Sequence, residues 1–491
     1  MGEKPAIDIA LEQVVIIGGG FGGLAMACEL KRKLGFHDFV IYERDAGLGG
    51  TWYHNNYPGA ATDIPGAVYQ LSFAPEHNFD CVFPTRNEIQ AYIESVASKF
   101  EIHSHLRCNY SWIESSWIEK RNCWRSKFCH TISGELRVHE SRILISATGH
   151  LVNPKSFDVP GRAGFKGSVL HSARWPEDVD LKGKNIVVLG NGSTAVQLVP
   201  AILDDVRTCT QIQKEPQWIL NRPNPQVPAS LKKAFLWFPF LFSMIQHLGF
   251  AFAELFYPLL GRHIPRMSKK QLKQCAVPKR YHKLLTPSYE AGCKRLVFAS
   301  HYLQCLKNLK FDLVQDSIIG MGDNDVHTAS GRRYPCDVLI LAHGFEYENF
   351  TLPLKGRHGI TPEEHWQVAG GPSCYKGCVM NGFPNFFMLR GPNMASGHNS
   401  VIYYIETTIA LILAVATPLI RGSGARVEIK SDAELNYARK VQAACREGVW
   451  GRGCSTYYVN GEGWNHTVYP WSSYRLWFHR FWRRTEWTIE P

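Results

Sequence analysis

The sequence predicts an α/β protein with two Rossmann-like dinucleotide-binding domains, the second inserted into the first. Two segments share the order apolar strand, glycine turn and amphipathic helix, namely VVIIGGGFGGLAMACELKRKL from Val14 and NIVVLGNGSTAVQLVPAIL from Asn185. Two further apolar runs each end in a glycine, RILISATGHL at 142–151 and DVLILAHGF at 337–345. We expect the chain to cross between the two nucleotide domains at these two glycines.

These crossings divide the 491 residues into three parts. Residues 1–150 are expected to form the first part of one nucleotide domain. Residues 151–335 are expected to form the other, with an apolar helical excursion near 230–290. Residues 336–491 then complete the first domain and supply a C-terminal segment. A single hydrophobic core does not grow to this chain length, so a division of this kind is expected.

Composition indicates a globular protein with 45% hydrophobic and 20% charged residues. The net charge is +11, but the basic residues are scattered, which argues against nucleic-acid binding and favours a surface that attracts an anionic cofactor. The fourteen cysteines form no CxxC pair, so we expect reduced thiols and a cytoplasmic protein. Cys374 and Cys378 lack matching partners, so no metal site is predicted. Neither an export signal nor an obligate protein partner is evident.

Residues 234–260, AFLWFPFLFSMIQHLGFAFAELFYPLL, are long and apolar enough to raise the question of a membrane. Polar residues and prolines interrupt the run at Pro239, Gln246, His247, Glu254 and Pro258. Because a buried glutamate is costly in lipid, we do not expect a span, and contact with a membrane surface stays open. The favoured interpretation is a helical excursion over the active site, whose aromatic side chains wall a cavity for an apolar substrate.

The first glycine turn predicts a flavin or nicotinamide dinucleotide. Gly18, Gly20 and Gly23 satisfy GxGxxG directly after a strand, and Glu43 follows twenty residues after Gly23. Such glycines let the backbone approach a pyrophosphate at a helix N-terminus, while the carboxylate accepts a hydrogen bond from a ribose hydroxyl.

The second turn differs at the position that selects the ribose. Gly190, Gly192 and Ala195 form the turn, and Lys214 stands where a carboxylate would bind the ribose. A cation there favours the 2′-phosphate of NADPH, although an exposed surface lysine offset by Glu215 is the alternative. Together the turns predict FAD in the first domain and NADPH in the second, as in a flavin reductase or monooxygenase.

The stretch FKGSVLHSARWP precedes the second turn and matches a known pattern, FxGxxxHxxxWP, at Phe165, Gly167, His171, Trp175 and Pro176. In these residues the chain resembles the class B flavin monooxygenases, and specifically the Baeyer–Villiger monooxygenases. The resemblance implies that the stretch lies at the join of the nucleotide domains and orders their geometry. It therefore gives His171 a positioning role and not that of a general base.

The resemblance extends along nearly the whole chain. GGTWYHNNYPGAATDIP (49–65), GCKRLVFASHY (292–302), FPNFFMLRGPNMASGHNS (383–400) and YYVNGEGWNHTVYPW (457–471) are similar to segments of this family. Beyond the glycine turns, it implies these cofactor-binding residues: Gly50, Thr51, Trp52, Asp63, Tyr69, Ser193, Thr194, Lys214, Lys294 and Asn399.

The implied reaction consumes NADPH and O₂ and inserts one oxygen atom beside a ketone carbonyl, which gives an ester or lactone. Arg295 is the catalytic candidate, because a guanidinium stays protonated and can stabilise a developing oxyanion. Asp63 would orient Arg295, and Lys294 would contact the NADPH phosphate. The aromatic excursion favours a bulky apolar ketone, such as a polyketide or terpenoid intermediate of the fungal secondary metabolism in which short family members occur.

One departure from the family and three alternatives remain open. Ala342-His343-Gly344 replaces the usual Ala-Thr-Gly, which is either a packing change or an altered cofactor linkage, while Ala147-Thr148-Gly149 is retained. The nearest rival is a flavin monooxygenase that oxygenates nitrogen or sulfur. A flavin disulfide reductase would need a redox dithiol, normally CxxC. A degenerate flavoprotein that serves as a scaffold is the non-enzymatic alternative.

Overall fold

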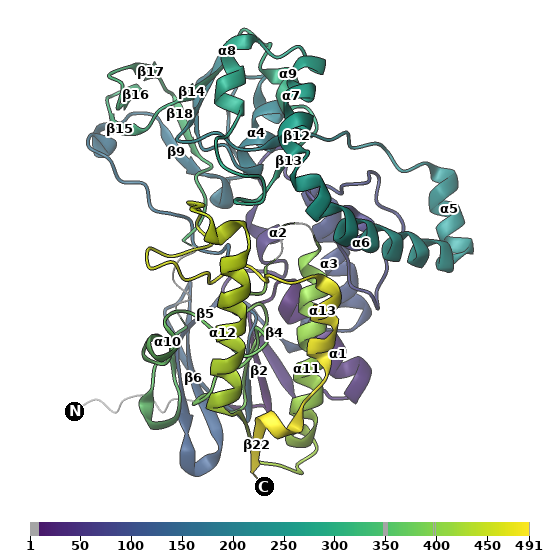
Figure 1. Cartoon of the computed structure of the whole chain (residues 1–491). Coiled ribbons are helices and arrows are strands. Elements are labelled where there is room, and N and C mark those ends of the chain that lie inside the picture. Colours follow the sequence, from purple (N-terminus) through teal and green to yellow (C-terminus); the bar gives the residue numbers. More distant parts are fainter. Residues whose placement is uncertain (1–8, 347–351, 396, 398, 491) are drawn as a thin grey trace, which may run out of the picture.

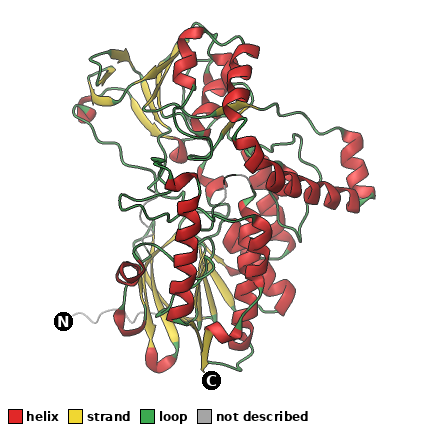
Figure 2. Ribbon diagram, viewed as in Figure 1, coloured by secondary structure: helices red, strands yellow, loops and turns green. Residues whose placement is uncertain are grey.

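The computed structural model describes residues 9–490 except 347–351, 396 and 398. It contains two separate five-stranded parallel sheets with helices packed against them, one below the other in the view of Figures 1 and 2. The predicted α/β class with two Rossmann-like units is confirmed.

The first sheet is buried on both faces. Its strands lie in the spatial order β20 (Phe386–Met388), β8 (Ile143–Ser146), β2 (Val14–Ile17), β3 (Phe39–Tyr42) and β4 (Leu106–Arg107). All neighbouring pairs are parallel. Val14 and Ile16 face the core beneath the helices, whereas Val15 and Ile17 face a second sheet. Burial on both faces explains why this strand is a continuous apolar run.

Helices cover one face of the first sheet, and a mixed sheet covers the other. The helices are α1 (Phe21–Leu34), α3 (Arg86–Lys99) and α11 (Val401–Ile420). The mixed sheet is β1 (Ile9–Leu11), β7 (Leu136–Ser141), β6 (Cys123–His130), β5 (Tyr110–Ile118) and β19 (Leu354–Lys355). By length and composition α11 could cross a membrane, but 61% of its most apolar window is buried, as in a core helix.

The second sheet carries the second glycine turn. Its strands lie in the order β14 (Phe311–Gln315), β11 (Thr208–Gln213), β10 (Asn185–Leu189), β18 (Val338–Leu341) and β9 (Ser168–His171), all parallel. Helices α4 (Ser193–Ile202) and α9 (Tyr302–Cys305) pack on one core of this sheet. A small antiparallel sheet follows with β15 (Ile318–Met321), β16 (Asp325–Thr328) and β17 (Arg333–Pro335). Strand β18 follows residue 335, the expected boundary, but pairs with β10 and β9 of this sheet. We therefore propose that this domain extends to Leu341. The crossing expected near 150 stays a prediction.

The helical excursion leaves the second domain after β12 (Ile219–Asn221) and returns at β13 (Val297–Ala299), which pairs with β12 in parallel. Between them lie α5 (Ala229–Trp237), α6 (Pro239–Gly261), α7 (Ile264–Gln274) and α8 (Lys279–His282). The chain bends by 108° between α5 and α6, and α5 lies at the outer edge of the molecule (Figure 1).

Further α-helices and strands complete the described part of the chain. They are α2 (Thr51–His54), α10 (Pro362–Ala369), β21 (Arg426–Ile429), α12 (Ser431–Glu447), α13 (Ser473–Trp477) and β22 (Trp487–Glu490).

Candidate active site

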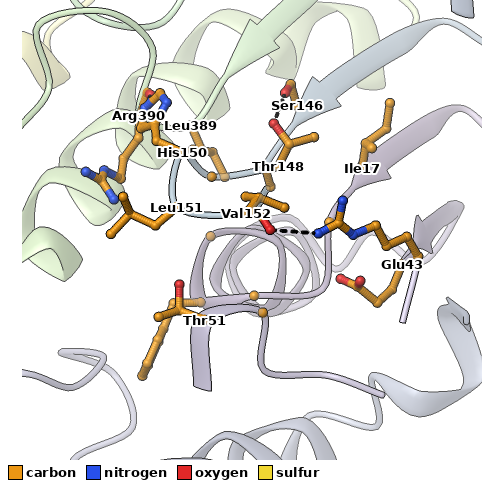
Figure 3. A pocket seen from close by; sticks show the side chains of 18 of the residues that line it. Ile17, Glu43, Thr51, Ser146, Thr148, His150, Leu151, Val152, Leu389 and Arg390 are labelled. Carbon is orange, nitrogen blue, oxygen red and sulfur yellow. Dashed lines mark hydrogen bonds between the residues drawn. The ribbon is translucent and has the colours of Figure 1, made fainter. Parts of the chain in front are cut away.

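A cavity of about 450 Å³ opens where the strands of the first sheet end. Ile17, Tyr42 and Ser146, the last residues of β2, β3 and β8, all line it, which is the usual ligand position in a parallel sheet. Figure 3 shows the side chains of Glu43 and Thr51 around this cavity. Seven residues predicted to bind a cofactor line it: Gly18, Gly20, Glu43, Gly50, Thr51, Trp52 and Tyr69.

The first glycine turn has the shape that a pyrophosphate requires. Gly18 has a φ of +107°, and a Cβ there would lie 2.5 Å from the carbonyl oxygen of Ala147. A Cβ on Gly23 would lie 1.9 Å from the carbonyl oxygen of Gly18, so α1 can begin this close to β2 only with glycine. No side chain caps α1 at Gly20, which leaves backbone N–H groups directed at the cavity. The turn therefore fits FAD.

Glu43 is held beside this turn by the backbone. Its carboxylate accepts hydrogen bonds from the Gly19 N–H at 2.5 Å and the Asp45 N–H at 2.9 Å. Only 6% of the residue is exposed, and this burial raises the pKa of Glu43 above its usual value. A fixed carboxylate at the end of β3 is placed to accept a hydrogen bond from a ribose hydroxyl.

Two aromatic side chains close one end of the cavity. The Trp52 Nε1–H donates to the Tyr69 hydroxyl at 3.2 Å, and the two rings meet edge to face at a centroid distance of 5.7 Å. Arg86 holds the short helix α2 in place by donating to the carbonyl oxygens of Trp52 at 2.6 Å and Tyr53 at 3.1 Å. Burial raises the pKa of Tyr69 to about 12, so its hydroxyl stays neutral.

Asp63 and Arg295, which are 232 residues apart, form an ion pair across the two nucleotide domains. Nη2 and Nε of Arg295 donate to Oδ2 of Asp63 at 2.7 and 3.1 Å. The Asp63 charge raises the pKa of Arg295 above its ordinary value. Both charges act on the Tyr69 hydroxyl, which lines the cavity, and 38% of the Arg295 side chain remains exposed. Neither Asp63 nor Arg295 lines the cavity itself, but the pair lies close enough to Tyr69, which does line it, for both charges to shift the pKa of that residue.

Arg222 belongs to the same cluster and was missed by the sequence analysis. Its Nη1 donates to the backbone carbonyl oxygen of Asp63 at 2.8 Å. Its guanidinium lies 3.3 Å from the ring centroid of Phe83 and 4.6 Å from that of Phe298. Burial lowers the pKa of Arg222 to about 10. Arg222 belongs to no motif that the sequence analysis used. Its contact with Asp63 arises only in the folded chain.

The second glycine turn resembles the first in its geometry. Gly190 has a φ of +122°, and a Cβ there would lie 2.2 Å from the carbonyl oxygen of Ala342. Around a Cβ on Gly192, which precedes α4, no heavy atom of the described residues lies within 4 Å, and no side chain caps the helix. The turn therefore leaves room for a pyrophosphate at the N-terminus of α4, where Ser193 and Thr194 begin the helix, and it fits NADPH.

Lys214 lies directly after β11, next to this turn. Asn191 Nδ2 donates to the carbonyl oxygen of Glu215 at 2.7 Å, which ties the segment after β11 to the turn. The Glu215 carboxylate pairs with Lys294 at 2.6 Å and with no other described cation within 4.0 Å. Glu215 therefore compensates Lys294, not Lys214. The Lys214 side chain is exposed beside the turn.

His171 lies where the two domains join. It ends β9, opposite Leu341 of β18, and its Nδ1 accepts a hydrogen bond from the Ala173 N–H at 3.1 Å. Its Nε2 then carries the proton and donates to the carbonyl oxygen of Gly344 at 3.2 Å. Burial lowers the pKa of His171, which favours this neutral form.

The residues around His171 hold the same segment of the chain in place by packing. Phe165 and Trp175 pack against two different cores of the second domain, and a Cβ on Gly167 would lie 2.3 Å from the carbonyl oxygen of Asp337. The ring of His343 lies 5.5 Å from that of His171, and its backbone N is 3.3 Å from a Cβ built on Gly190. His343, which replaces the usual threonine of Ala-Thr-Gly, thus lies between the domain join and the second turn.

Comparison with known proteins places this geometry in a family. A family model described as pyridine nucleotide-disulphide oxidoreductase matches residues 12–233. A Baeyer–Villiger monooxygenase of Pseudomonas aeruginosa is 33% identical over 479 residues, which cover 94% of this chain and 88% of the relative. A Baeyer–Villiger monooxygenase of Streptomyces coelicolor is 31% identical over 93% of this chain and 88% of its own length. The chain belongs to the Baeyer–Villiger monooxygenases.

The fold of this monooxygenase agrees with that assignment. The crystal structure of a cyclohexanone monooxygenase from Rhodococcus sp. Phi1 bound to NADP⁺ matches 98% of the chain with a TM-score of 0.85 at 22% identity, and all of that structure is covered. The predicted enzyme class is confirmed, and FAD and NADPH are its cofactors. The reaction inserts one oxygen atom from O₂ beside a ketone carbonyl.

The structure also corrects two expectations. None of the described side chains of 234–260 lines the cavity that fits FAD, so the excursion does not wall it there, and Trp237 and Phe240 are 79% and 65% exposed. Cys293 and Cys454 form a disulfide, so the expectation of reduced thiols is wrong for this pair. Neither of them lines the cavity, as a flavin disulfide reductase would need.

Asn399 does not line the described cavity, and its amide is bonded to residues outside that lining. Its Nδ2 donates to Glu254 at 2.9 Å and to Ser473 at 3.3 Å. Glu254 belongs to α6, so Asn399 joins the excursion to the first domain. Contact of Asn399 with FAD stays a prediction, and positions 396 and 398 of the same motif lie outside the described residues.

Proposed function

We propose that Arg295, oriented by Asp63, is the cation that promotes oxygen insertion beside a ketone in this enzyme. The observation that carries the proposal is their ion pair at 2.7 Å, which joins one nucleotide domain to the other beside Trp52 and Tyr69. The charges of both side chains reach Tyr69, which lines the cavity, so the pair is placed to act on groups that bind there.

The roles of the protein groups follow from charge and position. When bound, FAD supplies the oxygen atom that it takes from O₂ after reduction by NADPH. Arg295 stabilises the negative charge that develops on the ketone oxygen as the carbonyl carbon is attacked. Asp63 fixes the direction of the guanidinium, and Arg222 fixes the backbone of Asp63. Because Arg295 cannot lose its proton at working pH, it acts by electrostatics and not as an acid.

The test replaces Arg295 with alanine and, separately, with lysine. We expect Arg295→Ala to lower kcat for ester formation by about 10²–10³-fold, by analogy with the loss of one oxyanion donor. NADPH oxidation should continue and release hydrogen peroxide in place of ester. Arg295→Lys should recover only part of the loss, because an ammonium cannot reproduce the two hydrogen bonds to Asp63.

The exposed Lys307 of the same domain provides a control, and Lys307→Ala should leave ester yield per NADPH unchanged. Unchanged ester formation by Arg295→Ala would refute the role of Arg295. Oxidation of amines or thioethers with ketones untouched by the wild type would favour the enzyme class that oxygenates nitrogen or sulfur.

The bulky apolar ketone stays a prediction, and its support has changed. The cavity described above fits FAD and no described side chain of the aromatic excursion lines it, so the prediction rests on the sequence alone. Incubation with NADPH and a panel of polycyclic, linear and small cyclic ketones, followed by mass spectrometry for the gain of one oxygen, tests it. Conversion of the small cyclic ketones alone would contradict it.

A further inference from the structure

Helix α6 shows an apolar side to the solvent. Five large apolar residues spaced by four, four, four and three positions share one exposed face: Phe240, Met244, Leu248, Phe252 and Leu255. Their exposed fractions lie between 49% and 65%. Leu236, Trp237 and Phe238 continue this surface onto α5, with exposed fractions of 52% to 79%. We call these eight residues the apolar ridge.

The opposite side of α6 is the one that binds the protein, and it carries polar groups. Gln246 Nε2 donates to the carbonyl oxygen of Ala67 at 2.7 Å. Glu254 is 7% exposed and accepts hydrogen bonds from Asn399 Nδ2 and the Ser473 N–H, both at 2.9 Å. The same side also buries apolar residues, since Phe242 is 5% exposed and packs against His77, and Phe250 contacts Tyr403 and Tyr474, so α6 is apolar on both faces.

The size of the apolar ridge marks it as a contact surface. With about 150–250 Å² for each large side chain, its exposed parts add up to roughly 900 Å². The largest apolar patch on a typical soluble monomer is about 300–600 Å², and larger patches mark interaction sites.

The charges of the excursion indicate what kind of partner covers the apolar ridge. Residues 229–274 contain seven Lys and Arg residues and one acidic residue, Glu254, which is buried and bonded to Asn399. The basic residues lie along the chain on both sides of the ridge: Lys232, which pairs with Asp80 at 2.7 Å, and the further cations Lys233, Arg262, Arg266, Lys269, Lys270 and Lys273. A second copy of this chain would bring the same cations face to face, whereas an anionic bilayer attracts them.

We propose that the excursion is an interfacial anchor that inserts the apolar ridge into an anionic membrane surface while the enzyme stays on one side of it. The 108° bend and the polar bonds of Gln246 and Glu254 hold α6 along the protein and prevent a span. From Phe240 to Leu255 the helix is about 22 Å long, which lays the ridge along the interface as a peripheral helix does. Figure 1 shows α5 and the adjoining end of α6 extending to the outer edge of the molecule.

The test is flotation of the full-length, FAD-loaded enzyme with phosphatidylcholine vesicles, with and without phosphatidylserine. We expect binding that phosphatidylserine strengthens and salt weakens. The variant Trp237→Ser/Phe240→Ser should lower the partition coefficient by at least about tenfold, because each side chain loses apolar burial. Lys269→Gln/Lys270→Gln should remove part of the phosphatidylserine effect only. Turnover of a water-soluble ketone should not change in any of these variants.

Matched controls exist elsewhere on the surface. Ile132 and Leu309 are 78% and 100% exposed but lie outside the excursion, so Ile132→Ser and Leu309→Ser should leave vesicle binding unchanged. Failure of the wild type to float with either kind of vesicle would overturn the proposal. So would a dimer in sedimentation experiments that Trp237→Ser/Phe240→Ser dissociates, since the ridge would then be a contact between two copies.

Discussion

Glu43 and Lys214 follow the two glycine turns at corresponding places and carry opposite charges. Glu43 is buried and fixed by two backbone N–H groups, whereas Lys214 is exposed beside the second turn. The Glu43 carboxylate can accept a hydrogen bond from a ribose hydroxyl, whereas the Lys214 ammonium can pair with a 2′-phosphate. We therefore expect the identity of one side chain at each turn to separate the two cofactor sites.

The Lys214 interpretation leads to a prediction on coenzyme preference. Loss of a charge-assisted bond to phosphate costs about 1.5–3 kcal/mol, so Lys214→Ala should raise the KM for NADPH by about 10–100-fold. The KM for NADH, which lacks the phosphate, should hardly change. Lys182→Ala, on the surface of the same domain, is the control in steady-state kinetics with both coenzymes. Equal changes for NADPH and NADH would contradict the role of Lys214.

At the scale of elements, two short strands bring the arginines together. Strand β13 begins two residues after Arg295, and β12 ends directly before Arg222. Their parallel pairing, with Leu220 opposite Phe298, places both side chains near Asp63. Two residues before Arg295, the disulfide of Cys293 with Cys454 ties the chain to the segment that contains Tyr457 and Tyr458. The charges of these two tyrosines raise the pKa of Arg295.

We expect the disulfide to position Arg295. Cys454→Ser should lower the yield of ester per NADPH several-fold and lower the free energy of unfolding by about 2–4 kcal/mol. Dithiothreitol should lower the yield of the wild type in the same way and have no effect on Cys454→Ser. Cys305→Ser, a free cysteine in the same domain, should behave as the wild type. A yield that neither the variant nor the reductant changes would show that the loop holds Arg295 without the bridge.

At the scale of the whole molecule, hydrogen bonds between the two nucleotide domains position the loop that carries Asp63. Tyr57 donates to Gln197 of α4 at 2.8 Å, and Gln197 donates to the carbonyl oxygen of Ala61 at 3.0 Å. Asn224 exchanges two hydrogen bonds of 2.9 Å with the backbone of Phe83. These bonds lie before and after Asp63 in the chain and hold its loop against the second domain.

Buried histidines make the stability of the molecule depend on pH. Burial lowers the pKa of His150 and His479 to about 3 and that of His139 to about 4. In the unfolded chain these groups take up protons below about pH 6.5. Between pH 6.5 and 4 the unfolded state therefore binds more protons, and the free energy of unfolding falls as the pH falls.

Each such histidine contributes a slope of up to about 1.4 kcal/mol per pH unit. His479→Gln should remove one contribution, whatever it does to stability at neutral pH. Urea unfolding of the FAD-loaded enzyme between pH 7 and 4.5 measures the slope, and the exposed His263→Gln is the control. A slope that is the same in His479→Gln and the wild type would contradict the assignment.

Prediction from sequence succeeded where the determinants are local. The glycines of both turns and Glu43 lie within short stretches whose spacing reflects the backbone geometry itself. The segment around His171 was placed at the domain join by resemblance. Prediction of Asp63 and Arg295 depended on resemblance, since nothing local joins residues 232 apart. Arg222 and the Cys293–Cys454 bridge escaped altogether, because no motif reports which distant segments meet.

The apolar excursion marks the same division. Its composition predicted a helix, but composition cannot say which face of that helix turns inward, and the expected cavity wall became an exposed ridge. By itself, the sequence determined the two nucleotide-binding units and the charge at each, because strand, turn and helix propensities act between neighbouring residues. Only the tertiary structure decided which arginines surround Asp63, which cysteines pair and which side of α6 meets solvent, because these depend on packing between segments far apart in the chain.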